Sequence, residues 1–342
     1  DPRLRADTMT VGERSSTTVV LIYMAGLTLP DLVTEVKARL QRIRIDAVLD
    51  SGYVSELISD TTLTPFPMTR ATERSDVAAA AILEGKVVLI VDGSPHALVV
   101  PTLFHEGMQA VEDYYQHWTT ASFIRFLRYT YLMVALLGPA TYIGLLSFHQ
   151  EMLPTSLLLS IMRNREGVPF PALVEALLME ISFEALREAG VRLPRNVGQA
   201  VSIVGALVIG EAAVRAGIVS PAMVIVVAIT GISSFVIPLY SSALAVRLLR
   251  FPMMILAGTF GFLGVALGLI ILSVHLASLR SFGVPYMAPS MPPTMSDMKD
   301  MMIRAPWWFM RERPKLVPVL DRQRLRGNRG PHPPSETGGT RV

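Results

Sequence analysis

Apolar residues are concentrated in the middle of the chain, between Phe126 and Leu279, and two regions of ordinary polarity flank them. A helix that crosses a bilayer needs about 20 mostly apolar residues. Four runs are close to that length or exceed it: 126–148, 197–214, 218–239 and 251–279. The pattern predicts a multi-span α-helical membrane domain at 113–280, preceded by a soluble α/β domain at 1–112 and followed by a flexible basic tail at 281–342.

The first region alternates between short β-branched runs and stretches with helical spacing. Pro30 suits the first turn of a helix, and Gly85 suits the end of one. Asp92 to Pro95 forms a turn signal between two apolar runs, which indicates a hairpin. The predicted elements are strands at 18–23, 86–91 and 97–100, and helices at 29–43, 53–58 and 75–84.

An amphipathic helix is predicted at 172–189, between the first two apolar runs. Glu180, Glu184 and Glu188 recur every four residues and share one stripe, with Arg187 close enough to pair with either of the first two. Such a helix either lies at the bilayer surface or presents its acidic stripe to an aqueous pore formed by several subunits. Rings of acidic side chains attract cations in channels.

The topology follows from the basic residues. Arg125 and Arg128 flank the entry to the first apolar run, and basic residues are frequent after position 281. The positive-inside rule places both flanking regions in the cytosol, which requires an even number of crossings. Four runs satisfy this if the 172–189 helix lies in the interface or against other subunits. Counting that helix as a fifth crossing would put the tail outside.

Composition supports a membrane protein. The chain of 342 residues is 51% hydrophobic and only 17% charged, with a mean hydropathy of +0.44. A soluble domain usually carries about 25% charged residues. The chain has no cysteine, which excludes disulfides and thiolate metal sites. The net charge of +3 comes largely from the basic tail. A basic tail beside a transmembrane segment more often follows from the positive-inside rule than from nucleic acid binding, so we expect no nucleic acid partner. Because the chain starts at Asp1, we expect the α/β domain to be incomplete at its N-terminus.

Charged and hydroxyl side chains within the apolar runs are the candidate functional residues. Glu211 and Arg215 are spaced as an i,i+4 ion pair, and either stabilise a helix end or face a water-filled interior. Thr230, Ser233 and Ser234 share a helical face, and either line a conduit or donate back to the carbonyl one turn earlier. The predicted pore-lining or gating residues are Glu180, Glu184, Glu211, Arg215, Thr230, Ser233 and Ser234.

No catalytic constellation is visible. The six histidines are scattered, and no zinc, phosphate-loop, nucleophile-elbow or dinucleotide motif stands in a fitting context. We therefore predict that the protein is not an enzyme and has no cofactor or metal. Gly264 and Gly268 form a GxxxG pair, which indicates close helix packing more than a ligand site.

Many stretches, in order along the chain, resemble the GerA family of spore germination proteins, specifically the A subunit of nutrient germinant receptors. In the first region they are Asp50–Tyr53, Glu56–Asp60, Pro65–Pro67, Thr72–Asp76 and Glu84–Pro95. They continue with Glu112–Tyr115, His149–Thr155, Arg165–Pro171, Arg187–Pro194, Ile203–Gly210, Ala216–Pro221, Arg247–Phe251, Ser281–Tyr286 and Ile303–Trp307. Ser75 stands where the family usually has proline.

The resemblance implies a subunit of the endospore inner membrane, with cytosolic N- and C-terminal regions, that works with a permease-like B subunit and a lipoprotein C subunit. It also implies a homo-oligomer in membrane lipid, forming a nutrient-gated channel for monovalent cations that starts germination. A SpoVAF-like paralogue, acting with the dipicolinic acid release machinery, shares most of these stretches. A receptor scaffold that does not conduct is a further alternative.

Overall fold

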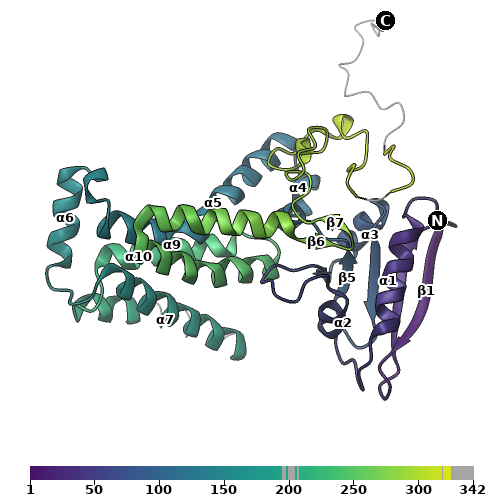
Figure 1. Ribbon diagram of the computed structural model, residues 1–342, viewed down its shortest axis with the longest axis horizontal. Helices are drawn as coiled ribbons and strands as arrows, with labels where there is room; N and C mark the ends of the chain where they lie inside the picture. The colour runs from purple at the N-terminus through teal and green to yellow at the C-terminus, as the bar shows by residue number, and fades with distance from the viewer. Residues whose placement is uncertain (195–197, 199–204, 206–207, 318, 325–342) are drawn as a thin grey trace, which may run out of the picture.

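The computed structural model describes residues 1–194, 198, 205, 208–317 and 319–324, and shows an α/β domain beside a bundle of helices (Figure 1). The domain contains a five-stranded sheet with strand order β1-β2-β4-β5-β3, and all neighbouring strands are antiparallel. The expected hairpin is confirmed, with Val87 opposite Val100. The strands are β1 (Leu4–Val11), β2 (Thr17–Met24), β3 (Arg70–Thr72), β4 (Val87–Val91) and β5 (Ala97–Val100), of which β1 and β3 were not predicted.

Helices cover both faces of this sheet, because its strands alternate apolar side chains between the two faces. Leu21 of β2 joins the core formed with α1 (Pro30–Arg42) and α2 (Ser51–Ile58). Its neighbour Ile22 packs on the other face, against α3 (Ser75–Leu83). The three helices predicted in this region are therefore confirmed, with Pro30 in the first turn of α1.

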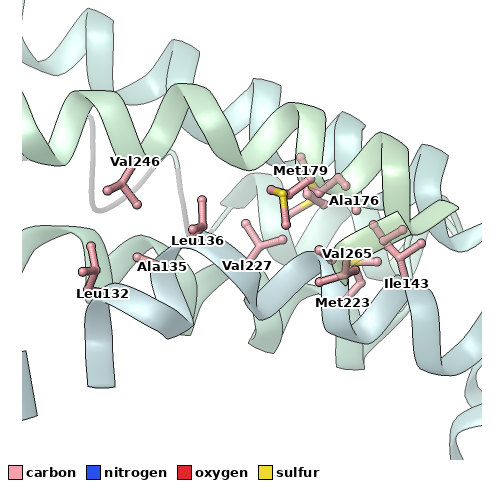
Figure 2. Packing of buried hydrophobic residues seen from close by; sticks show 14 of the residues in the cluster. Leu132, Ala135, Leu136, Ile143, Ala176, Met179, Met223, Val227, Val246 and Val265 are labelled. Carbon is pink, nitrogen blue, oxygen red and sulfur yellow. The ribbon is translucent and has the colours of Figure 1, made fainter. Parts of the chain in front are cut away.

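The bundle consists of long helices that share one apolar core (Figure 2). They are α5 (Trp118–Ser147), α7 (Ala172–Arg192), α9 (Pro221–Phe235) and α10 (Tyr240–Ser278). The short α4 (Glu112–Tyr115) leads into α5, and α6 (Thr155–Arg165) lies at the opposite end of the bundle (Figure 1). We call the end of the bundle beside the α/β domain the domain end, and the end that carries α6 the distal end.

The last apolar run folds as a helical hairpin, so the prediction of one span at 251–279 is wrong. Gly261, inside α10, has a positive φ of 62° and a non-helical backbone. Glycine adopts such a conformation far more readily than residues with a side chain. The chain reverses there: a Cβ on Gly264 would meet the carbonyl of Leu256, and one on Gly268 would meet Met253. Gly264 and Gly268 are confirmed as a packing face, which lies between the two halves of α10.

Two of the described helices, α5 and α10, are long and apolar enough to cross a membrane, and α9 is a shorter apolar helix. The predicted run at 126–148 corresponds to α5, which begins earlier, at Trp118. The predicted run at 218–239 corresponds to α9. Half of the predicted run at 197–214 lies outside the described residues.

The chain after α10 returns to the α/β domain. A small hairpin of β6 (Arg280–Ser281) and β7 (Val284–Pro285) inserts Phe282 into the core of the sheet. Further along, Val319 bridges Thr28, and the guanidinium of Arg324 lies 2.6 Å from the carboxylate of Glu84. The described part of the segment after α10 therefore packs partly on the α/β domain and partly on α4 and the start of α5. The disorder expected at 327–342 falls on residues outside the described part.

Candidate functional site

A buried ion pair lies in the middle of the bundle, between α7 and α10. Glu180 and Arg250 are both almost fully buried, and an oxygen of Glu180 lies 2.6 Å from Nη1 of Arg250. Nε of the same arginine donates to the carbonyl of Ala135 in α5, at 2.8 Å. That carbonyl is available because Pro139, one turn later, has no N–H to donate to it. Arg250 therefore compensates for a proline within α5 while neutralising a carboxylate of α7.

A second, more open group of charges lies one turn nearer the domain end. Glu184 is half-buried and lies 3.2 Å from Arg187 and 3.5 Å from Arg247. The predicted pairing of Arg187 with Glu184 is confirmed. Arg187 also approaches Oγ of Ser234 on α9, at 3.5 Å, and its guanidinium lies over the ring of Phe235. Together with Glu180 and Arg250, this network joins α7, α9 and α10.

The network retains unused hydrogen-bonding capacity. Within the described part of the chain, Oε1 of Glu180, Nη2 of Arg250 and Nε of Arg247 are buried without a protein partner. Buried polar atoms normally find a partner, in protein or in ordered water. The region between α7 and α10 is therefore a polar site in an otherwise apolar core, suited to holding water or to rearranging its ion pairs.

The hydroxyls of α9 donate to carbonyls of their own helix, which is one of the two alternatives that the sequence left open. Thr230 donates to the carbonyl of Val226 and Ser233 to that of Ile229, each at 2.7 Å, and Ser234 donates to Gly231. All three are buried within the single chain. A Cβ on Gly138 of α5 would lie 2.8 Å from Oγ1 of Thr230, so Thr230 marks a close approach of two helices.

Glu211 and Arg215 lie apart from the buried network. They form the expected i,i+4 ion pair, at 2.5 Å, and both side chains are exposed. Gly217, which follows them, approaches the carbonyl of Gly167, so this pair lies toward the distal end. The seven residues predicted to act together are thus divided between a buried group and two exposed positions, Glu184 being intermediate.

Sequence reasoning gave no role to Glu175, which is fully buried at the distal end. One of its oxygens lies 2.6 Å from Arg165, and the other accepts the backbone N–H of Ser220 at 2.9 Å. The carboxylate thereby joins the end of α6 to the start of α9. Its position in the first turn of α7, soon after Arg165 along the chain, was the only available signal.

The two arginines at the start of α5, which flank the first apolar run, are buried by the protein itself and paired with carboxylates. Arg125 is fully buried, 2.9 Å from Asp113 and 2.7 Å from Asp300. Arg128 binds the same Asp113 at 2.9 Å. Burial alone would raise the pKa of Asp113, but the bonds from Arg128 and Arg125 outweigh it and lower that pKa. These ion pairs fasten α5 to α4 and to the segment after α10.

The described residues do not show the pattern expected of a metal site. In that part of the chain, no group of three or more histidine, aspartate or glutamate side chains is arranged to hold a metal ion. The arrangement instead provides ionised groups inside a helical bundle, where they bind one another and can interact with water or ions.

Comparison with known proteins identifies the family. The Bacillus/Clostridium GerA spore germination protein family matches residues 1–316. A Bacillus subtilis protein described as an uncharacterized membrane protein, YfkQ, is 51% identical over 312 residues, which is 91% of this chain and 61% of that protein. Spore germination protein KA of Bacillus subtilis is 50% identical over 338 residues, 99% of this chain and 62% of that protein.

A solved structure shares sequence with the first part of the chain. The crystal structure of the N-terminal domain of the A subunit of the Bacillus megaterium spore germinant receptor GerK3 is 44% identical, covering 30% of this chain and 82% of that one, with a TM-score of 0.25. The chain spans a little over three fifths of the length of the first two relatives. On the match over 316 residues and identities near one half, this chain belongs to the GerA family of spore germination proteins.

Proposed function

We propose that this chain is the membrane subunit of a nutrient germinant receptor, and that copies of it assemble into a nutrient-gated cation channel that starts spore germination. Its partners are a permease-like B subunit and a lipoprotein C subunit, in the inner membrane of the endospore. Membership of the GerA family supports the role in germination. The observation that carries the channel is the presence of acidic and basic side chains on bundle helices whose exposed residues are otherwise mainly apolar.

We propose six crossings of the bilayer, with the α/β domain and the segment after α10 together in the cytosol. α5 runs from the domain end to the distal end, and α7 returns. Gly198 lies beside Gly190 of α7, and Gly217 lies at the distal end beside Gly167, so we count one further crossing between these two glycines. α9 and the two halves of α10 complete the six. An even number agrees with the packing of the segment after α10 against the α/β domain.

Within this topology, we place the half-buried Glu184 and the exposed Glu211 beside the ion pathway. A charge at the centre of a bilayer costs about 2.5–3.5 kcal/mol on insertion scales, so Glu184, near the middle of the bundle, requires water or protein around it. Glu211 and Arg215 lie nearer the distal end. A passage shared between subunits supplies that water, and carboxylates favour cations there. Glu180, Thr230, Ser233 and Ser234 are buried behind this surface, and we assign them to the wall that positions it and to gating.

The test is a cation flux measurement on the full-length protein in liposomes, with and without its two partner subunits. Glu184→Gln and Glu211→Gln are expected to reduce flux or cation selectivity, because each removes a negative charge from the pathway. Glu13→Gln, at an exposed turn of the α/β domain, is the matched control and should conduct normally. Unchanged flux in both bundle variants would remove these residues from the pathway.

A non-conducting scaffold is the second candidate, and one observation favours it. Glu180 pairs with Arg250, and the hydroxyls of α9 donate to carbonyls of their own helix, so these contacts form inside a single chain without a pore. A scaffold predicts normal assembly with the partner subunits and no ion flux under any nutrient. A SpoVAF-like accessory channel would conduct without the permease-like subunit, and the same flux measurement separates it from a receptor subunit.

A further inference from the structure

The short helix α6 is placed unlike the other helices of the bundle. It lies across the distal end, whereas α7, α9 and α10 run along the bundle (Figure 1). None of its eleven residues is buried. It is nevertheless held in place, because Arg165 at its C-terminal end bonds the fully buried Glu175. The helix α6 is therefore held in place while its side chains remain exposed in the single chain, and we ask what they contact in the cell.

The sequence of α6 separates apolar and polar residues around the helix. Successive residues are turned by about 100°, which follows from 3.6 residues per turn. Ser156, Ser160, Arg163 and Asn164 then fall on one arc, which we call the polar arc. The remaining circumference is mainly apolar, and we call it the apolar arc: Leu157, Leu158, Leu159, Ile161 and Met162.

Much of the apolar arc is uncovered. Leu157, Leu159 and Met162 are 47%, 52% and 50% exposed, whereas Leu158 and Ile161 are partly covered by the rest of the chain. A groove separates α6 from the adjoining ends of α5 and α7. Its lining includes Leu146, Leu158, Met162, Arg163, Arg165 and Ala172. Ser147, Gln150 and Glu166 also line it, so the groove combines apolar side chains with polar and charged ones.

The exposed apolar surface of α6 continues into that of α10. Phe260, Leu263 and Ile271 are exposed along the hairpin of α10. The exposed Phe148, just before α6, lies against the turn at Gly261, and His149 stacks on Phe262 with ring centroids 4.7 Å apart. The apolar belt of the hairpin therefore reaches the distal end beside α6.

We propose that α6 lies in the interfacial layer of the lipid bilayer at the distal end of the bundle. The exposed residues of its apolar arc contact acyl chains, and its polar arc faces the headgroups, where Arg163 meets lipid phosphate. Amphipathic helices with basic residues on the polar face bind bilayers in this orientation. The proposal rests on the proposed membrane-spanning topology, because the bundle must cross the bilayer for its distal end to reach the interface.

The absence of cysteine allows a direct test with single spin labels. The full-length protein is placed in vesicles of phosphatidylcholine and phosphatidylglycerol, with one cysteine at a time at 156, 157, 159, 160, 162 or 163. Collisions with oxygen, which concentrates among acyl chains, are compared with collisions with a water-soluble nickel chelate. Positions 157, 159 and 162 should favour oxygen, and 156, 160 and 163 should favour nickel, with a period of about 3.6 residues.

A label at Ile271→Cys on α10 separates failure of this proposal from failure of the topology. With that label in lipid, nickel access at all six α6 positions means that α6 lies in water, and the proposal is overturned. Exclusion of both reagents at all six positions means that a second copy or another protein covers α6, which also overturns it. If the label at 271 itself favours nickel, the bundle does not span the bilayer, and both proposals fall together.

Discussion

Arg250 shows how much one side chain does inside the bundle. It bonds Glu180 on α7 and the Ala135 carbonyl that Pro139 leaves unpaired on α5, while its own backbone belongs to α10. Isolated charges in an apolar interior are very unfavourable, so each partner is tolerated only because the other is present. The pair therefore fixes the relative positions of three helices at one depth.

Breaking this pair on one side should be costly. Arg250→Met leaves Glu180 buried and unpaired, and we expect it to lower the free energy of unfolding by about 3–5 kcal/mol. The double variant Glu180→Leu/Arg250→Met removes both charges and should recover most of that loss. Unfolding of the purified protein in detergent measures both variants. A double variant no more stable than Arg250→Met would show that the ion pair is not the reason for the loss.

His105, which lies between the α/β domain and the bundle, makes the free energy of unfolding depend on pH. Burial lowers its pKa from 6.5 to about 4, while its ring bonds the hydroxyls of Tyr129 and Ser290. Between these values the unfolded chain binds a proton that the folded chain does not. The contribution of His105 to the free energy of unfolding is therefore constant above the pKa of the unfolded chain. As the pH falls toward the pKa of the folded chain, this contribution becomes destabilising, by up to about 3 kcal/mol.

Thermal unfolding at pH 7.5 and pH 5 checks this expectation. The unfolding temperature should fall with pH in the wild-type chain and fall less in His105→Gln, which cannot take up the proton. Equal decreases in the two proteins would contradict the assignment to His105.

At the scale of the elements, the turn at Gly261 decides the shape of the last apolar run. Its positive φ divides α10 into two antiparallel helices. A Cβ at this position would lie 2.9 Å from Cβ of Phe148, in addition to the backbone strain. The hairpin therefore depends on one residue without a side chain.

Gly261→Ala is expected to destabilise the protein by about 1–3 kcal/mol, the usual cost of a strained backbone conformation. Gly167→Ala is the matched control, because nothing lies within 4 Å of a Cβ there and its φ is not positive. The measurement is the unfolding transition of each variant in the same detergent. Equal stability of the two variants would mean that position 261 tolerates a side chain.

Local signals predicted individual elements better than their arrangement. Pro30, the Asp92–Pro95 turn and the i,i+4 pair of Glu211 and Arg215 were all interpreted correctly, because each depends on neighbours within a few residues. The hairpin at Gly261 was missed because α10 contains four glycines with similar apolar surroundings. The burial of Arg125 was missed because Asp300, one of its partners, lies 175 residues away.

At the scale of the whole molecule, the α/β domain and the bundle are coupled through several contacts. Phe282 enters the core of the sheet immediately after α10, beneath the guanidinium of Arg39. Asp60 accepts its backbone N–H. Arg125 and Arg128 hold the other side of the junction through Asp113 and Asp300. A movement of α5 or α10 would therefore be transmitted directly to the α/β domain.

Phe282→Ala should weaken this coupling and lower stability by about 3–5 kcal/mol, as truncation of buried phenylalanines does. Phe309→Ala is the control, since that ring is exposed in the same part of the chain. Protease cleavage between the two parts of the molecule should become faster only in the Phe282 variant. Equal cleavage rates in the two variants would show that Phe282 is not required for the contact between the α/β domain and the bundle.

The topology tests the account most directly, because the channel and the placement of α6 both depend on it. In sealed vesicles, single cysteines at Glu13, in the α/β domain, and at Thr259, beside the turn of α10, are probed with a membrane-impermeant thiol reagent. Six crossings predict that these two positions react from opposite sides of the bilayer. Reaction from the same side, or no reaction at 259 because it lies within the bilayer, would contradict the hairpin crossing and the proposals that depend on it.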